Sequence, residues 1–375
     1  KAYESWLEEQ WERLDAGRDV PANLAHIARA NLRRCDQALR RMRSAVQDIQ
    51  KDEHLRKAFR LANVAMDTQY GWATVAQGAP PLRWRPFQLA FVLMACTSAA
   101  RKDDDQRETM DLLWFPTGGG KTEAYLALIA LVAVYRRLSS DGSESGSGVS
   151  ALMRYTLRLL TTQQFARSAA VIIALEGIRK GRFGVGGLHT ELGEEPFSIG
   201  LWVGGEATPN KRQDAWNALM KGVPGTPSPK QLARCPVCHE LLSWSMEDIR
   251  SPVVVECRND ECSMQGDIPV TTIDEDVYER RPTLVIGTTD KFAQVPRQKS
   301  VNYLFGISDG NPPDLVLQDE LHLISGPLGT IAGTYESALD LLFTARGSRP
   351  KIIGSTATIR RAEEQVRALF DREAF

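Results

Sequence analysis

The stretch FPTGGGKTEA, from Phe115 to Ala124, constrains the fold of this chain more than any other. It overlaps the end of the apolar segment DLLWFP, which favours a β-strand, and it runs into a helix expected over residues 122–137. Glycines between a strand and a helix let successive backbone N–H groups converge on one anion, and the helix N-terminus adds partial positive charge. This order of elements therefore predicts a phosphate-binding loop, with a flexible turn before a helix as the alternative.

The residues of this loop suit a nucleoside triphosphate bound together with Mg²⁺. Lys121 is placed to reach the β- and γ-phosphate oxygens, and Thr122 is placed to hold the metal ion through its hydroxyl. The other residues expected around the phosphates are Thr117, Gly118, Gly119 and Gly120. One position departs from the general P-loop pattern, because Phe115 stands where that pattern has its first glycine.

Two acids further along the chain supply the partners that such a loop needs. The segment DLVLQDELHLI is an apolar strand that delivers Asp319 and Glu320 to its C-terminal end. Asp319 is placed to position Mg²⁺ through its water shell, and Glu320 is placed to orient and deprotonate an attacking water. Ordinary surface acids at a strand end are the alternative. The loop and the acids together, in this order, favour phosphoryl transfer.

Short apolar segments alternate with helical segments from about residue 85 onward. The further strands are expected in SALMRYTL, SIGLWVGG, PTLVIGTT and KIIGSTAT, and a second helix is expected over residues 162–179. This alternation predicts an α/β fold with a parallel sheet and helices on both faces. Residues 1–78 instead repeat apolar positions at helical spacing, with arginines on the other faces.

The chain therefore divides into an all-helical N-terminal region over residues 1–78 and an α/β domain over residues 79–375. The arginines of the helical region are predicted to form either a solvated basic face or a surface for a nucleic acid or a partner. Because the formal net charge is only −1, a nucleic-acid contact has to come from a local basic surface or from phosphate-binding loops. The longest apolar run, Tyr125–Tyr135, is too short to span a bilayer, and the charged N-terminus is no signal peptide. These features predict no membrane segment, and the six cysteines, four of them clustered, fit a metal site in a reducing cytoplasm better than a disulfide framework.

Four of the six cysteines lie in an insertion over residues 211–281. Cys235, Cys238, Cys257 and Cys262 follow the spacing C-x2-C-x18-C-x4-C. Two close pairs can form a tetrahedral thiolate site for Zn²⁺, and metal binding then supplies folding energy to a small unit with little apolar content. Four thiolates leave no open coordination position, so that the predicted zinc is structural. Cys35 and Cys96 lie in apolar helical segments and are expected in the core.

The phosphate loop, DELH at residues 319–322 and GSTATIR at residues 354–360 together resemble superfamily 2 helicases and translocases. The resemblance covers about residues 84–360, apart from the cysteine insertion. It implies a RecA-like P-loop NTPase domain of the DExH type that hydrolyses ATP to ADP and phosphate with Mg²⁺. The catalytic residues that it implies are Lys121, Asp319, Glu320 and His322.

Other motifs of that family follow in chain order. Gln88, in RPFQLAF, stands where the family has a glutamine that reads adenine, and Arg158, in TLRLLTTQQFA, stands where it has an arginine that contacts the nucleic-acid strand. A surface glutamine and a structural salt-bridge arginine are the alternatives for these two positions. The residues that the resemblance places in backbone-contacting elements are Gly204, Gly205, Thr288 and Thr289. The residues through which His322 is implied to couple hydrolysis to strand movement are Ser355, Thr356 and Thr358.

The particular stretches FPTGGGKTEAYL and QDELHLISGPLGT, with the cysteine insertion, resemble the large helicases of bacterial DISARM anti-phage systems. DUF1998-linked helicases with zinc-binding cysteines are similar as well. The resemblance implies DNA as the substrate, single-stranded or partly duplex, and a DUF1998-type partner subunit. Helicases of this class bind ATP between two RecA-like domains, and only 17 residues follow STAT. We therefore expect a second RecA-like domain in a longer chain, and poor hydrolysis by this part alone.

Two other functions compete with a DNA motor. An RNA helicase would use the same backbone-contacting motifs, since both nucleic acids present phosphates; dependence of binding on the 2′-hydroxyl would separate them. A scaffold with a degenerate ATPase fold would act through its helical region and its cysteine insertion. The intact set of Lys121, Thr122, Asp319 and Glu320 argues against the scaffold.

Overall fold

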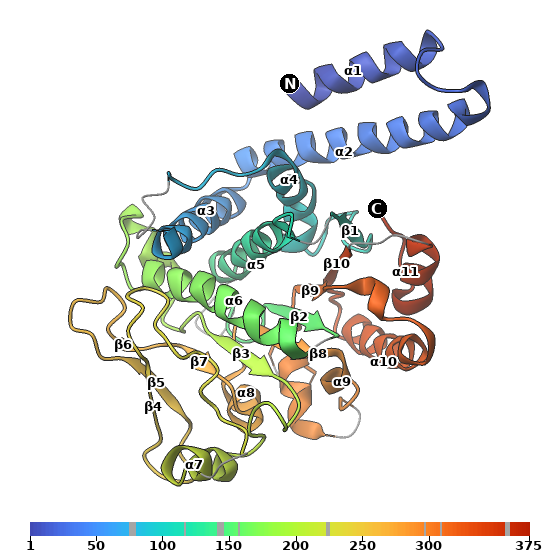
Figure 1. Ribbon diagram of the computed structural model, residues 1–375. Coiled ribbons are helices and arrows are strands. Elements are labelled where there is room, and N and C mark those ends of the chain that lie inside the picture. Colours follow the sequence, from blue (N-terminus) through green and yellow to red (C-terminus); the bar gives the residue numbers. More distant parts are fainter. Residues whose placement is uncertain are drawn as a thin grey trace.

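The computed structural model describes residues 1–74, 80–115, 118–140, 146–156, 158–222, 226–295, 298–307, 310–356 and 361–375, without the side chains of 158–162. A seven-stranded parallel sheet, in the order β1-β10-β9-β2-β8-β3-β7, forms its centre (Figure 1). The strands are β1 (Asp111–Trp114), β2 (Ala151–Tyr155), β3 (Ile199–Trp202), β7 (Val270–Thr271), β8 (Leu284–Thr288), β9 (Leu315–Gln318) and β10 (Lys351–Thr356). Six of them are the predicted strands. β7 was not predicted, because a strand of two residues is too short to show a recognisable alternation of apolar and polar residues.

Alternate residues of each strand enter two separate cores. Leu315, Leu317 and Ile353 pack into one core, whereas Val316 and Ile352 pack into the other. This alternation is the geometry of a strand whose two faces are both buried. The predicted class is therefore confirmed: a parallel α/β sheet covered by helices on both faces, as in RecA-like domains.

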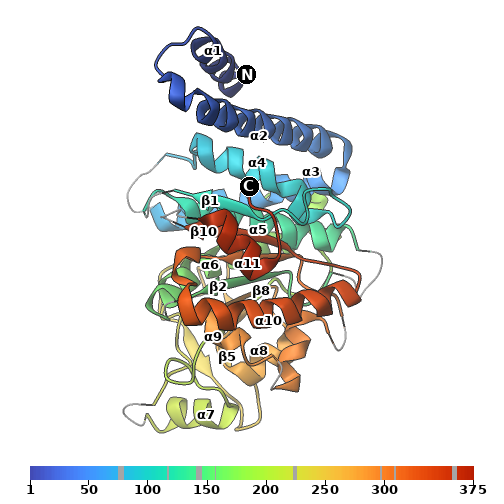
Figure 2. The same cartoon turned by 90° about the vertical axis from the view of Figure 1, so that its right-hand side faces the viewer.

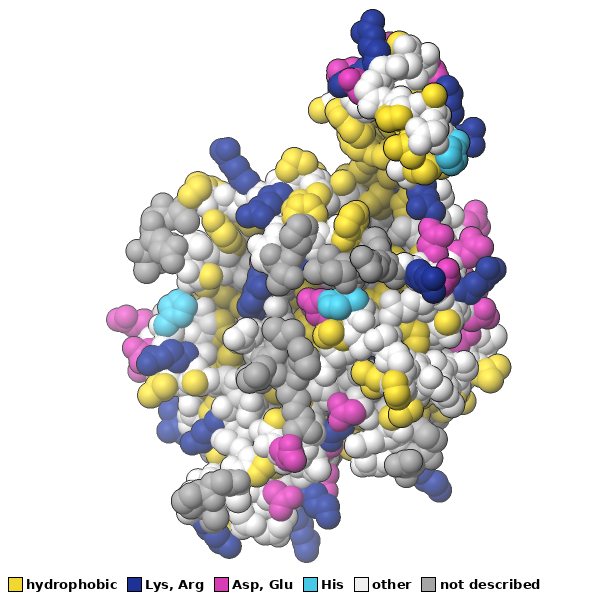
Figure 3. All heavy atoms as spheres, turned by 45° about the vertical axis from the view of Figure 1, so that its right-hand side comes forward, with side chains coloured by type: hydrophobic (Ala, Val, Ile, Leu, Met, Phe, Trp, Pro, Cys, Tyr) yellow, Lys and Arg dark blue, Asp and Glu magenta, His cyan; other side chains and the backbone are white. Residues whose placement is uncertain are grey.

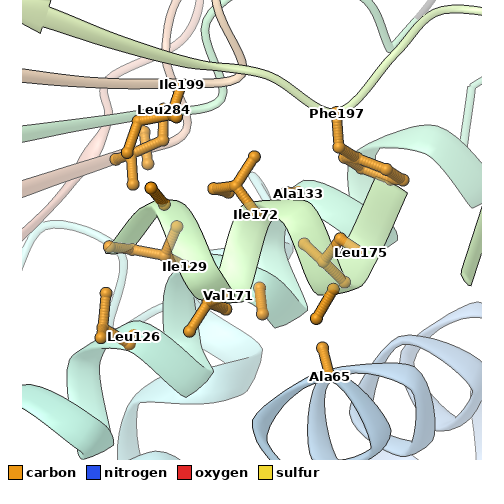
Figure 4. Packing of buried hydrophobic residues seen from close by; sticks show 14 of the residues in the cluster. Ala65, Leu126, Ile129, Ala133, Val171, Ile172, Leu175, Phe197, Ile199 and Leu284 are labelled. Atoms are coloured by element: carbon orange, nitrogen blue, oxygen red, sulfur yellow. The ribbon is translucent and has the colours of Figure 1, made fainter. Parts of the chain in front are cut away.

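The first core lies under α3 (Glu53–Thr74), α4 (Pro86–Ala100), α5 (Lys121–Leu138) and α6 (Arg158–Arg179). Figure 4 shows Val171, Ile172 and Leu175 of α6 among Ile129 of α5, Ala65 of α3 and Leu284 of the sheet. The helix predicted over residues 162–179 begins earlier, at Arg158, since Arg158–Thr161 continues it with two leucines and an arginine that favour helix.

The second core lies under α8 (Asp274–Arg280), α9 (Thr289–Phe292), α10 (Gly326–Ala345) and α11 (Ala362–Phe370). Figure 2 shows α10 and α11 on the face of the sheet opposite to α5 and α6. In this core Phe305 packs edge-to-face against Phe292 and tilted against Phe343, at centroid distances of 5.9 and 6.2 Å.

The N-terminal helices divide between the main body and an outer pair. α1 (Ala2–Asp15) and α2 (Ala25–Lys51) lie at the outside of the molecule in Figure 1, and Figure 3 shows hydrophobic side chains gathered where they meet the body. α3 is different, because its buried residues Leu55, Ala58 and Leu61 share one core with α5. The boundary at residue 78 therefore stays a proposal, and α3 packs as part of the α/β body.

Several arginines of α2 are engaged with acids. Arg41 pairs with Asp111 at the start of β1, Arg43 pairs with Glu4, and Arg29 pairs with Asp15 at 3.0 Å. These acids neutralise several of the arginines for which the sequence left open a role in binding nucleic acid.

The cysteine insertion adds a small antiparallel sheet of β4 (Ser243–Ser245), β5 (Val254–Cys257) and β6 (Gly266–Asp267), after the short helix α7 (Arg212–Met220). β7 and α8 fall within the predicted insertion, yet β7 extends the large sheet beside β3. No helix in the described part of the chain is long and apolar enough to cross a membrane.

Candidate functional site

Because all seven strands of the large sheet are parallel, their carboxyl ends meet at one edge. The sheet order places β1, β10 and β9 next to one another. The phosphate loop after β1, the acids after β9 and the residues at the end of β10 are therefore neighbours in space. Ligand sites of open α/β sheets form at such an edge.

The phosphate loop has the backbone shape that its glycines allow. Gly118 and Gly120 have φ angles of +78° and +90°, a region that residues with a side chain rarely adopt. A Cβ on Gly120 would lie only 2.8 Å from the Gln88 amide nitrogen. Pro116 and Thr117 lie outside the described residues, so the predicted role of Thr117 stays a prediction.

Lys121 is the first residue of α5 and is 7% exposed. Its Nζ is buried, and it has no hydrogen-bond partner in the described part of the chain. A buried ammonium group without a partner is costly unless an anion or acceptor joins it. The loop and Lys121 therefore fit a bound phosphate group.

Gln88 and Arg85 hold the loop from outside. Gln88 Nε2 donates to the Gly120 carbonyl at 2.8 Å, and Gln88 Oε1 accepts from the Arg85 backbone N–H at 2.9 Å. Arg85 Nη1 donates to the Gly119 carbonyl at 2.7 Å. Gln88 is only 5% exposed; its Nε2 holds the loop, whereas its Oε1 caps the start of its own helix at Arg85. One amide N–H and one oxygen lone pair remain for the predicted contact with adenine.

Thr122 and Asp319 meet through a tyrosine that the sequence reasoning missed. The Tyr125 hydroxyl lies 3.1 Å from Thr122 Oγ1 and donates to Asp319 Oδ2 at 3.3 Å. Tyr125 is 1% exposed, and burial raises the pKa of its hydroxyl, so it stays a neutral donor. The signal was present, since a residue three positions after Thr122 lies on the same side of α5.

Glu320 and His322 link this region to β10. Glu320 has a left-handed φ of +48°, and its backbone N–H donates to Asp319 Oδ1 at 2.9 Å. His322 Nδ1 lies 3.3 Å from Glu320 Oε2 and 3.0 Å from Thr356 Oγ1. Ser355 Oγ is buried without a hydrogen-bond partner among the described residues. Thr358 lies outside them.

The phosphate loop, Tyr125 and the two acids face one open cleft of about 910 Å³. Gln88, Lys121, Thr122, Asp319 and Glu320 all line it. This volume is in the range of small-molecule sites in proteins.

The four cysteines of the insertion form a second candidate site. Their sulfur atoms all lie within 4.8 Å of one another; Cys235 and Cys262 are 3.9 Å apart, and Cys238 and Cys257 are 3.6 Å apart. Four thiolates around Zn²⁺ at bond lengths of roughly 2.3 Å place the sulfurs about 3.8 Å apart. The sulfur donors and their spacing therefore fit a tetrahedral zinc ion. Cys35 is half-buried and Cys96 is buried.

No known family profile matches this sequence. A DISARM protein DrmA from Bacillus paralicheniformis is 34% identical over 438 residues, which covers 99% of this chain. The chain is a relative of DrmA. It spans 38% of that relative's length.

Solved helicase structures are also similar in fold. The DUF1998 helicase MrfA bound to DNA matches 83% of this chain and 27% of its own, at 15% identity and a TM-score of 0.45. The Mycobacterium smegmatis helicase Lhr bound to single-stranded DNA and AMP-PNP matches 82% of this chain and 27% of its own, at 17% identity and a TM-score of 0.46.

The residues that the resemblance to superfamily 2 helicases assigns to nucleic acid follow the neighbouring strands β8 and β3 of the same sheet. Gly204 and Gly205 follow β3, and Thr288 and Thr289 stand where β8 ends and α9 begins. Both threonine side chains are buried, and Thr289 Oγ1 donates to the Tyr155 carbonyl at 3.2 Å. Because both side chains are buried, the predicted contact of these threonines with nucleic acid stays a prediction. The side chain of Arg158 lies outside the described residues.

Proposed function

We propose that this chain is the ATP-binding motor domain of a DNA helicase or translocase that acts in bacterial anti-phage defence. The observation that carries the proposal is the buried Lys121 ammonium, which faces the same cleft as Thr122, Asp319 and Glu320. The relationship to a DISARM protein DrmA supports the proposed defence role. DNA is the substrate that the resemblance of the sequence motifs implies.

The residues of the cleft suit hydrolysis by positioning and charge. Lys121 would neutralise the phosphate oxygens, and the glycine loop would donate backbone N–H groups to them. Thr122 and Asp319 would hold Mg²⁺, whose charge stabilises the phosphoryl group in transfer. Glu320 would orient the attacking water and accept its proton. The Tyr125 hydroxyl lies between Thr122 and Asp319 and holds the two side chains in position through hydrogen bonds.

His322 would couple the nucleotide site to the carboxyl end of β10. Its ring lies between Glu320, the proposed base, and Thr356 at the end of β10. A change at Glu320 on hydrolysis can therefore alter the contact with Thr356. We infer that Ser355, Thr356 and Thr358 carry this change towards the strand held by Gly204, Gly205, Thr288, Thr289 and Arg158.

Three further parts belong to the proposal. The four cysteines hold a structural zinc ion, since the set leaves no open position. A second RecA-like domain in a longer chain completes the nucleotide site, and a DUF1998-type subunit is the proposed partner. The proposed domain division is residues 1–78, residues 79–375 and the insertion over residues 211–281, with α3 of the first region packed on the α/β body.

The test is ATP hydrolysis by the longer protein with DNA, with RNA and with no nucleic acid, with Lys121→Ala and Glu320→Gln as matched controls. We expect stimulation by DNA that both variants abolish. Stimulation by RNA alone would overturn the DNA assignment in favour of an RNA helicase. Absence of hydrolysis under every condition, with zinc bound and the fold intact, would overturn the motor in favour of a scaffold.

A further inference from the structure

The first cysteine pair lies beside the nucleotide cleft, which the sequence did not indicate. Pro236 lies between Cys235 and Cys238, and His239 follows Cys238 directly. Both residues line the same cleft as Lys121 and Asp319. The insertion is therefore part of the wall of the candidate active site, although more than 100 residues separate it from the phosphate loop in sequence.

The cysteine pair sets the position of His239. The His239 backbone has a left-handed φ of +63°, its N–H donates to the Cys235 carbonyl at 2.9 Å, and its carbonyl accepts from Arg234 Nη1 at 2.9 Å. Left-handed backbone is uncommon for histidine and persists only where neighbouring contacts enforce it. A metal ion that joins Cys235 and Cys238 to the other two sulfurs would fix this turn.

His239 also joins the insertion to the helix that forms the adjacent wall. His239 Nε2 lies 3.1 Å from the Trp72 carbonyl in the last turn of α3. Gln69 and Tyr70, from the same end of α3, line the cleft too. Both are partly exposed. Gln69 Nε2 donates to the Met66 carbonyl at 3.1 Å, so the second N–H and the oxygen of this amide, together with the Tyr70 ring, are what the wall offers to a ligand.

The wall formed by α3 and the cysteine turn differs in chemistry from the phosphate end. Lys121, Thr122 and Asp319 suit phosphate and metal, whereas a phenol ring, an imidazole and an amide suit a planar base and a ribose. Gln88 Nε2 is bonded to the Gly120 carbonyl of the loop, and Gln88 Oε1 is bonded to the Arg85 backbone N–H, so this amide keeps one N–H and one lone pair for a base. The outer wall is thus the place for further recognition of the base.

We propose that His239, with Gln69 and Tyr70, forms the base-and-ribose part of the nucleotide site, and that metal binding by the four cysteines sets nucleotide affinity through His239. The proposal rests on the proposed function, because it assumes that the cleft binds a nucleotide. It makes the insertion a component of the active site as well as a folding unit.

The test compares two ligands that share phosphates and differ in the base. Binding of ADP and of inorganic tripolyphosphate is measured by calorimetry on the zinc-loaded chain, with circular dichroism as the check of fold. His239→Gly keeps the left-handed backbone free of strain, and Cys262→Ser weakens metal binding without changing the turn itself. His26→Ala, an exposed histidine on α2, is the matched control.

We expect each of His239→Gly and Cys262→Ser to weaken ADP binding by about five- to tenfold, the usual effect of one lost hydrogen bond, and to leave tripolyphosphate binding unchanged. Lys121→Ala should weaken both ligands. ADP affinities equal to wild type in both variants would overturn the inference while leaving the proposed function intact. Equal loss of ADP and tripolyphosphate would also overturn it, since that pattern marks general disruption. Failure of the wild-type chain to bind either ligand would refute the nucleotide site itself.

Discussion

Asp111→Asn should destabilise this protein more than any exposed acid would, because Asp111 joins the outer helices to the strand that leads into the phosphate loop. Arg41 of α2 donates two hydrogen bonds to the Asp111 carboxylate, at 2.6 and 2.8 Å, and Lys351 of β10 lies 3.0 Å from it. Asp111 and Arg41 are 5% and 9% exposed, and Lys351 is fully buried. The substitution keeps the shape of the side chain and removes the only negative charge of this group.

The size of the effect follows from the two cations that remain. Removing one partner of a buried ion pair costs about 3–5 kcal/mol of unfolding free energy. Burial already lowers the pKa of Lys351 to about 8, while Asp111 acts to raise it. The variant should lower this pKa further, so that Lys351 loses its proton near neutral pH and limits the cost to about 3 kcal/mol at pH 7.

The sign of the pH dependence follows from proton linkage. Below the wild-type pKa of about 8, wild-type Lys351 stays protonated while the variant has already lost the proton. The folded variant then binds fewer protons than the folded wild type, so its stability rises faster with pH. The difference in unfolding free energy between the two proteins should therefore shrink as the pH rises towards and through 8.

Urea unfolding at pH 7 and at pH 9 measures this difference. Asp103→Asn is the matched control, since Asp103 is exposed and pairs with Arg101 at 3.0 Å. Because exposed pairs contribute little, its effect should stay below about 1 kcal/mol at both pH values. A loss below about 1 kcal/mol for Asp111→Asn at pH 7, or a loss that grows with pH, would refute the reasoning.

Three other predictions concern the sites. Tyr125→Phe removes the hydroxyl between Thr122 and Asp319, and we expect it to raise the Mg²⁺ concentration for half-maximal nucleotide binding by about tenfold, with a melting temperature near wild type; an unchanged Mg²⁺ dependence in a titration would contradict this role. His322→Ala removes the ring beside Thr356 Oγ1, so nucleotide affinity should persist while stimulation of hydrolysis by nucleic acid is lost; stimulation equal to wild type in an ATPase assay would rule out the coupling. Cys262→Ser should reduce bound zinc, measured by mass spectrometry, from one ion per chain to almost none; full occupancy in the variant would exclude Cys262 as a ligand.

The fold could be predicted because its strands carry clear signals. Leu315, Val316 and Leu317 form a continuous apolar run followed by acids, and such a run is typical of a strand buried on both faces. The cysteine spacing likewise predicted four sulfur atoms that meet. β7 could not be predicted, because it is two residues long and is set by pairing with β3.

The candidate site could be predicted only in part, since several of its contacts join segments that are distant in sequence. Nothing in RPFQLAF shows that the Gln88 amide is bonded to Gly120, and nothing in CPVCH shows that His239 reaches the Trp72 carbonyl. The packing of α3 against α5 also depends on the whole fold, although its small residues Ala58, Ala62 and Ala65 permit a close approach.

The central claim is that Lys121, Thr122 and Asp319 bind a nucleotide together with Mg²⁺. Calorimetric titration of AMP-PNP into this chain, with and without Mg²⁺, tests it most directly when wild type is compared with Lys121→Ala and Asp319→Asn. The account predicts Mg²⁺-dependent binding by the wild type, loss of binding in Lys121→Ala, and binding without Mg²⁺ dependence in Asp319→Asn. Binding that is the same in all three proteins, or no binding by a folded wild-type chain, would contradict it.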